Sequence, residues 1–173
     1  YSYRADKLSR PASTMKLLTA ITALSRPDAD EPFRTEVWHD GVIEHDTLQG
    51  NLYVVGGFDP EFDSQAMDSL IEEVMTFPFS VINGQVYGDV SMKDSLYWGH
   101  GWAWDDTPAG YQPYLSPLMF CKGTVQISVF PSAVQGDTAS ISCKPVSSYY
   151  TLTNRTKTRT SSAGKFSFSR DWL

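Results

Sequence analysis

Two side chains near the start of the chain could together perform acyl transfer: Ser13 and Lys16. They lie three residues apart, and side chains at that spacing are neighbours on one face of a helix. Pro11, just upstream, suits the first turn of a helix, and residues 17–24 form an apolar run of helical length. A serine hydroxyl becomes a good nucleophile when a nearby amine takes its proton. Ser13 and Lys16 are therefore the candidate nucleophile and base.

The residues that follow Ser13 predict a buried helix. Apolar side chains recur at intervals of three, and only two threonines interrupt the apolar surface. Burial would remove water from Lys16 and disfavour its charged form, and the positive helix N-terminus would act in the same direction. The same N-terminus would favour an oxyanion near Ser13. A simpler interpretation stays open, in which Ser13 caps the helix and Lys16 is an ordinary surface lysine.

The Ser-x-x-Lys pattern is not specific by itself, because a serine-rich chain of this length should contain about one by chance. A second copy runs from Ser162 to Lys165 among threonine, serine and glycine residues, with no apolar helix behind it. We interpret the second copy as a chance occurrence.

Three further stretches accompany the serine motif of residues 10–20. They are a Gln-Gly-Asn-Leu strand that ends in Gly-Phe-Asp-Pro (49–60), an Ile-Asn-Gly-Gln-Val-Tyr-Gly-Asp segment (82–89) and a Gly-Trp-Ala-Trp-Asp-Asp loop (101–106). An aromatic residue, Tyr111, follows the last aspartate of the loop by five positions. In this order they resemble the motifs of the penicillin-binding proteins, specifically the class C low-molecular-mass D-alanyl-D-alanine carboxypeptidase/endopeptidase family.

The resemblance implies an α+β fold. The expected architecture is part of a penicillin-binding-protein/beta-lactamase-like transpeptidase domain, followed by an inserted β-rich domain. We place the N-terminal segment of the catalytic domain at residues 1–61 and the inserted domain, complete or incomplete, at residues 62–173. The abundance of Thr, Ser, Val and Tyr from residue 116 onward favours β structure for the second part.

The resemblance also implies a function, that of a serine-type D-Ala-D-Ala carboxypeptidase/endopeptidase. Its substrates are peptidoglycan stem peptides that end in D-Ala-D-Ala, and beta-lactam antibiotics acylate the same serine. Ser13 and Lys16 would be catalytic, without a metal or organic cofactor. The family acts in the periplasm or outside the cytoplasm, although this chain carries no recognisable signal peptide.

A substrate-binding role follows for Asp106 and Tyr111. In the resembled family, the matching residues bind the amino end of the stem-peptide side chain, and a carboxylate suits an ammonium group. The alternative interpretation is a tryptophan-rich satellite core that is capped by solvated acids.

The chain departs from the family pattern in two places. It contains neither Ser-x-Asn nor Lys-Thr-Gly, the second and third motifs of the family; residues 122–124 read Lys-Gly-Thr instead. We therefore expect an incomplete fragment that does not finish a catalytic cycle. Two alternatives stay open, a non-catalytic cell-wall-binding or interaction module and a relative of the beta-lactamases or beta-lactam sensors.

Composition limits the remaining function classes. The chain is 41% hydrophobic and 20% charged, which is typical of a globular protein. Its net charge of −6 argues against nucleic acid and against anionic membranes as partners. No apolar run is long enough for a transmembrane segment, and the three histidines lack metal-ligand spacing.

Several elements can be predicted from local signals. An Asp-Gly pair at residues 40–41 between strand-like runs indicates a hairpin, and residues 52–55 and 79–92 have strand character. A helix should begin at Asp63-Ser64 and stop before Pro78.

The two cysteines lie near a second predicted hairpin. Its strands, residues 124–130 and 138–142, would bring Cys121 and Cys143 toward its open end. A disulfide and two separate thiols stay equally open.

Overall fold

The structure of the chain is a computed structural model. It describes residues 2–28, 30–106, 109–160 and 166–170. The chain divides into two compact units, Tyr1–Pro32 and Phe33–Leu173, and each is described here by itself. The predicted division between residues 61 and 62 into catalytic and inserted domains stays a prediction.

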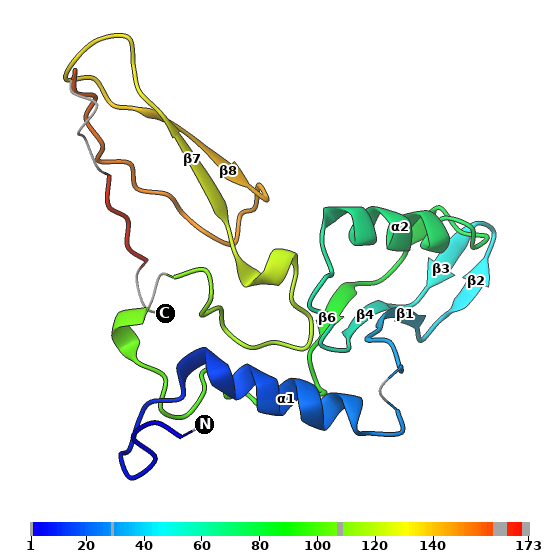
Figure 1. The fold of residues 1–173 in the computed structure, drawn as a ribbon. Coiled ribbons are helices and arrows are strands. Elements are labelled where there is room, and N and C mark those ends of the chain that lie inside the picture. The colour runs from blue at the N-terminus through cyan, green and yellow to red at the C-terminus, as the bar shows by residue number, and fades with distance from the viewer. Residues whose placement is uncertain (1, 29, 107–108, 161–165, 171–173) are drawn as a thin grey trace. The chain divides into compact units, whose positions relative to one another are not determined.

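The first unit contains one short 3₁₀ turn, η1 (Ala12–Thr14), which leads into α1 (Met15–Leu24). The second unit holds all other regular elements of the described chain (Figure 1). These are β1 (Thr35–His39), β2 (Val42–Glu44), β3 (Thr47–Gln49), β4 (Leu52–Gly56), α2 (Ser64–Val74), β5 (Val81–Ile82), β6 (Val86–Asp89), η2 (Trp104–Asp106), η3 (Cys121–Gly123), β7 (Gln126–Phe130) and β8 (Ser140–Lys144).

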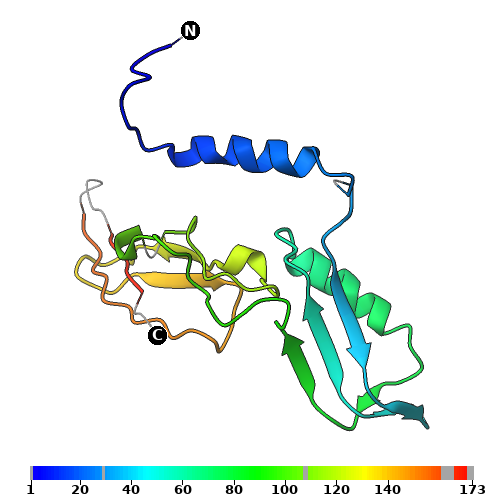
Figure 2. The same cartoon turned by 90° about the horizontal axis from the view of Figure 1, so that it is seen from below.

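Two small sheets share one helical crossover. The first has the order β1-β4-β6, with β1 antiparallel and β6 parallel to β4. The second has the order β2-β3-β5, with β2 antiparallel and β5 parallel to β3. Parallel neighbours need a long connection, and α2 lies in the connection that leads from β3 and β4 to β5 and β6 (Figure 2). Leu48 in the central strand β3 is fully buried.

The predicted helix α2 is confirmed, and its start has a clear cause. The carboxylate of Asp63 accepts hydrogen bonds at 3.0 Å from the backbone N–H groups of Gln65 and Ala66. These groups would otherwise lack partners at the helix N-terminus. The helix ends at Val74, ahead of Pro78.

The predicted hairpin at Asp40-Gly41 is wrong. The strands on either side of this pair do not pair with each other, since β1 pairs with β4 and β2 pairs with β3. The tight turn instead lies at His45 and Asp46, whose φ angles are 47° and 66°. Two successive residues with positive φ give the two-residue turn that matches the twist of paired strands.

The second predicted hairpin is confirmed. β7 and β8 pair in antiparallel register, with Ile127 opposite Cys143. Both cysteines of the described chain are free thiols. Residues 151–160 form no helix or strand, and they contact the segment that follows β7: the Thr158 hydroxyl oxygen accepts a hydrogen bond from the Ser132 N–H at 2.9 Å.

Asp40 has a structural role at the end of β1. Its carboxylate accepts hydrogen bonds from the Tyr53 hydroxyl at 2.7 Å and from the Asn51 backbone N–H and side-chain amide at 2.7 and 2.9 Å. The ring of Tyr53 stacks on that of Tyr87 in β6, with centroids 5.4 Å apart. These hydrogen bonds, that from Tyr53 foremost, lower the pKa of Asp40 from 3.8 to about 2.

We predict that this cluster makes folding stability depend on acid pH. The pKa of Asp40 is lower in the folded state, so its carboxylate favours folding above about pH 4. The contribution should be lost as the pH falls from about 4 to about 2. Scanning calorimetry should therefore show a steeper loss of thermal midpoint for the wild type than for Asp40→Asn across this window. Asp68→Asn, at an exposed position of α2, should keep the wild-type slope; a wild-type slope for Asp40→Asn would contradict the prediction.

Candidate functional site

Ser13 lies in η1, the turn that runs directly into α1. It is the middle residue of η1, and Lys16 is the second residue of α1. The backbone N–H of Thr14 donates to the carbonyl of Pro11 at 3.0 Å, and the Thr14 hydroxyl donates to the same oxygen. The predicted helix start is confirmed. Because positions three apart lie on the same side of a helical turn, Ser13 and Lys16 lie on one side of the turn that begins α1.

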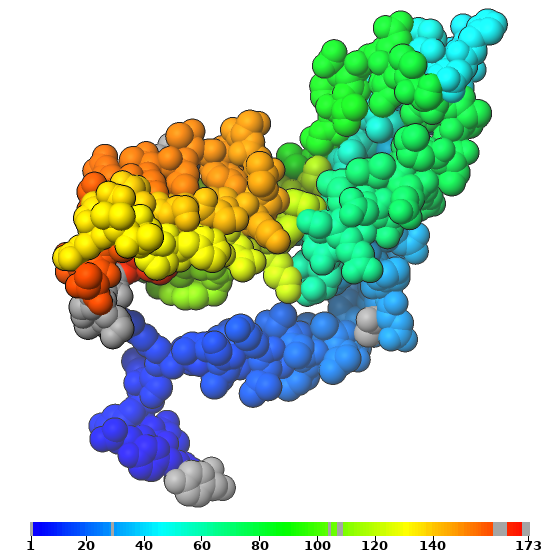
Figure 3. All heavy atoms as spheres, turned by 90° about the horizontal axis from the view of Figure 1, so that it is seen from above, coloured from blue at the N-terminus to red at the C-terminus, as the bar shows by residue number. Residues whose placement is uncertain are grey.

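The predicted burial of α1 is wrong for this chain. Its side chains are exposed throughout, and the surface view shows α1 in blue (Figure 3). Leu24, for example, is 79% exposed. The physical reason lies in the first unit, whose described residues contain no second helix or sheet against which α1 could pack. Lys16 is exposed as well, so the predicted loss of water around its side chain does not occur in this structure.

Asp106 and Tyr111 lie together, as their assignment to one site requires. Asp106 is the last residue of η2 and is half-buried, whereas Tyr111 is exposed. The Tyr111 hydroxyl donates to Asp106 Oδ1 at 2.8 Å. This hydrogen bond is the main reason why the pKa of Tyr111 is raised. A carboxylate has about four lone-pair positions, so a hydrogen bond from one tyrosine leaves it able to accept a further donor.

A residue that the sequence did not single out, Gln112, supports this pair. Gln112 is polar but buried, with 6% exposure. Its side-chain amide donates to the carbonyl of Ala103 at 3.3 Å, and the same carbonyl accepts the backbone N–H of Asp106 at 3.3 Å. Gln112 thus ties the residue next to Tyr111 to the turn that carries Asp106. A glutamine next to a loop is a weak sequence signal, because glutamine is usually a surface residue.

Aromatic rings flank this turn. Trp98 makes an edge-to-face contact with Trp102, with centroids 5.2 Å apart, and lies 5.6 Å from the ring of Tyr114. Pairs of this kind stabilise by about 0.5–1.5 kcal/mol beyond the area they bury. The expected tryptophan cluster therefore exists, and Asp106 and Tyr111 lie close to it in the sequence. Both interpretations of the loop, a binding site and a satellite core, are compatible with these contacts.

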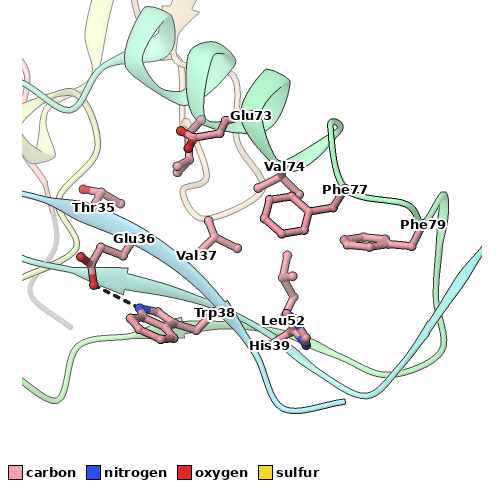
Figure 4. A pocket seen from close by; sticks show the side chains of 11 residues that line it. Thr35, Glu36, Val37, Trp38, His39, Leu52, Glu73, Val74, Phe77 and Phe79 are labelled. Atoms are coloured by element: carbon pink, nitrogen blue, oxygen red, sulfur yellow. Dashed lines mark hydrogen bonds between the residues drawn. The ribbon is translucent and has the colours of Figure 1, made fainter. Parts of the chain in front are cut away.

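The two predicted parts of the site belong to different units. Ser13 and Lys16 lie in Tyr1–Pro32, and Asp106 and Tyr111 lie in Phe33–Leu173. Within the second unit, a cavity of about 320 Å³ opens between α2 and β1 (Figure 4). Apolar side chains such as Val37, Val74 and Phe77 line it, with Glu73 at its edge. None of the four predicted site residues lines this cavity.

Two further features are absent from the described part of the chain. No cluster of three or more His, Cys, Asp or Glu side chains there could hold a metal ion. Among the same residues, no helix has both the length and the apolar character needed to cross a bilayer.

Fold and motif together define a class: an α+β protein in which a helix begins at a Ser-x-x-Lys turn. The sequence matches the D-Ala-D-Ala carboxypeptidase 3 (S13) family over residues 1–169, and the chain belongs to this family. It is 31% identical over 164 residues to a D-alanyl-D-alanine carboxypeptidase of Actinomadura sp., a match that covers 91% of this chain. It is 33% identical over 104 residues to the D-alanyl-D-alanine carboxypeptidase DacB of Haemophilus influenzae, a match that covers 60% of this chain.

The structure agrees with this assignment. It resembles the crystal structure of penicillin binding protein 4 (dacB) from Haemophilus influenzae, with a TM-score of 0.66 and 28% identity over 76% of this chain. The aligned part is 29% of that structure, and the two relatives are covered over 30% and 22% of their own lengths. The chain thus spans less than a third of the length of each of these three proteins.

Proposed function

We propose that the full-length gene product is a serine-type D-Ala-D-Ala carboxypeptidase/endopeptidase that acts on peptidoglycan stem peptides. The observation that carries the proposal is the Ser-x-x-Lys turn at the start of α1, in a chain that belongs to the D-Ala-D-Ala carboxypeptidase 3 family. The names of both relatives, each a D-alanyl-D-alanine carboxypeptidase, support the same substrate class.

The proposed reaction is acyl transfer in two steps. Ser13 Oγ attacks the carbonyl carbon between the two terminal D-alanines while Lys16 accepts the hydroxyl proton. The peptide C–N bond then breaks, and the proton passes to the departing D-alanine amine. Water hydrolyses the resulting ester, which regenerates the Ser13 hydroxyl and releases the shortened peptide. No step requires a metal or an organic cofactor.

Charge that develops on the carbonyl oxygen needs hydrogen-bond donors. The backbone N–H of Ser13 would supply one, and a strand carrying Lys-Thr-Gly would supply the other. The 173 residues contain neither this motif nor Ser-x-Asn. The catalytic cycle is therefore proposed for the full-length gene product, and this chain alone would not complete it.

Asp106 and Tyr111 would recognise the amino end of the stem-peptide side chain. A half-buried carboxylate suits an ammonium group, and the 2.8 Å hydrogen bond from Tyr111 holds that carboxylate in one orientation. We further propose that the second part of the chain belongs to a β-rich insertion in the catalytic domain.

Three other properties belong to the same proposal. Beta-lactams would acylate Ser13 as substrate mimics. The protein would act in the periplasm or elsewhere outside the cytoplasm, where peptidoglycan is found. Peptidoglycan and beta-lactams, rather than nucleic acid, would be its partners, in keeping with its net charge of −6.

The activity can be tested with the purified full-length gene product and a stem pentapeptide. We expect release of the C-terminal alanine from a peptide that ends in D-Ala-D-Ala, and no release of the C-terminal alanine from the matched peptide that ends in D-Ala-L-Ala. An amino-acid assay measures release, and calorimetry measures binding of both peptides. Binding without release would contradict the enzymatic proposal and favour a cell-wall-binding module. Hydrolysis of penicillin with rapid turnover, but no release of D-alanine, would favour a beta-lactamase relative.

A further inference from the structure

Arg170, close to the C-terminal end of the described chain, contacts the segment that follows Tyr111. Its Nη2 donates to the carbonyl oxygen of Gln112 at 3.4 Å, across 58 residues of sequence. Its guanidinium carbon lies 4.8 Å from the centre of the Tyr114 ring, which is cation–π distance. The Arg170 side chain is half-buried. Neither contact has a part in the acyl transfer described above.

The contact between Arg170 and the Gln112 carbonyl involves a residue that is hydrogen-bonded to the turn that carries Asp106. Gln112 directly follows Tyr111, and its side chain donates to the Ala103 carbonyl, which also accepts the Asp106 N–H. A displacement of the Gln112 backbone would therefore change the position of Tyr111 and the turn that carries Asp106. The hydroxyl–carboxylate hydrogen bond between them depends on both.

The second contact holds the end of the aromatic row. Tyr114 lies against Trp98, and Trp98 lies against Trp102, which is next to Ala103. The chain segments that carry Tyr114 and Trp98 are also linked through the backbone, since the N–H of Leu115 donates to the carbonyl of Tyr97 at 2.8 Å. Arg170 thus contacts both Gln112, which is hydrogen-bonded to the turn that carries Asp106, and Tyr114, which lies at the end of the aromatic row.

We propose that Arg170 is a positioning residue for the recognition of a substrate ammonium group by Asp106 and Tyr111. The inference rests on the proposed function and deepens it, because it assigns selectivity for the amino group to a contact made near the end of this chain. Arginine suits the task, since its planar guanidinium can donate to a carbonyl while it stacks on an aromatic ring. A lysine at this position would have one compact charge and could satisfy only one of the two contacts well.

The test uses the full-length gene product and two stem peptides, one with a free side-chain amine and one with that amine acetylated. Release of D-alanine gives KM and kcat for each, and penicillin titration counts the active sites so that rates refer to folded enzyme. The variants are Arg170→Met, Arg170→Lys and Asp106→Asn. Arg159→Met is the matched control, because it removes an exposed cation from the same C-terminal part of the chain.

We expect Arg170→Met to raise KM for the free-amine peptide about tenfold, with kcat and the acetylated peptide nearly unchanged. Arg170→Lys should give an intermediate increase of about threefold. Asp106→Asn should abolish the preference for the free amine, and Arg159→Met should match the wild type.

Four outcomes would overturn the inference about Arg170. One is a wild-type preference for the free amine in Arg170→Met. Another is an equal loss for both peptides, or fewer titratable sites with unchanged KM, which would indicate a purely structural role. If Arg170→Met does not fold, a wild-type preference in Arg170→Lys would overturn it. Failure of the proposed function is distinguishable, since then Asp106→Asn would also keep the preference or no peptide would be cleaved.

Discussion

Replacing Ser13 by alanine is expected to abolish covalent labelling of the full-length gene product by benzylpenicillin. The acyl-enzyme ester requires the Ser13 oxygen, and no other step of the proposed mechanism forms a bond to the drug. Intact-mass spectrometry should show the wild type heavier by one drug molecule after incubation, and Ser13→Ala at its unmodified mass. Because acylation and peptide cleavage use the same nucleophile, release of D-alanine should disappear in the same variant.

The chain supplies a matched control for this experiment. Ser162 is the serine of the other Ser-x-x-Lys sequence, and it lies outside the described residues. Ser162→Ala should be labelled as fully as the wild type. A drug adduct that persists in Ser13→Ala and is lost in Ser162→Ala would move the nucleophile to the second motif. Persistence in both variants would contradict an acyl-enzyme at either serine.

Replacing Lys16 by methionine is expected to slow acylation about 10²–10⁴-fold. Methionine has a similar length and favours helices, so α1 should persist while the proton acceptor is lost. The second-order rate of penicillin acylation, followed by quenched intact-mass measurements, gives the effect directly. The adduct should still form at long times, because Ser13 remains.

Lys7→Met is the control for the loss of a cation near the motif. Lys7 is exposed and pairs with Asp6 at 3.4 Å, before η1 begins. Its removal should leave the acylation rate within about twofold of the wild type, as surface charges have small effects. An unchanged rate in Lys16→Met would contradict the role of Lys16 as base. Equal losses in Lys7→Met and Lys16→Met would attribute the effect to general electrostatics.

Local chemistry made several elements predictable. The carboxylate of Asp63 caps α2, and the two N–H groups that it binds belong to residues that follow it closely in the sequence. The hairpin of β7 and β8 follows from two β-rich runs joined by a connection (131–139) that contains a proline and a glycine. The start of α1 beside Pro11 is of the same kind. In each case, the residues that determine the element are its neighbours in sequence.

The predictions that failed depended on distant partners. The Asp-Gly signal at residue 40 was strong locally, but β1 pairs with β4, and the Asp40 carboxylate binds Asn51 and Tyr53 instead. The apolar pattern of α1 is real, yet a helix is buried only where another layer covers it. Within the described chain, α1 has no such layer in its own unit.

The sequence by itself determined the family, the positions of Ser13 and Lys16 on one helical turn, and the candidate pair Asp106 and Tyr111. Only the tertiary structure showed that this pair is hydrogen-bonded, that Gln112 is buried and binds Ala103, and that Arg170 contacts Gln112. The physical reason is the range of the interactions. Helix starts and caps depend on contacts over about four residues. The contact between Arg170 and Gln112, by contrast, spans 58 residues, and no local sequence pattern identifies its two partners.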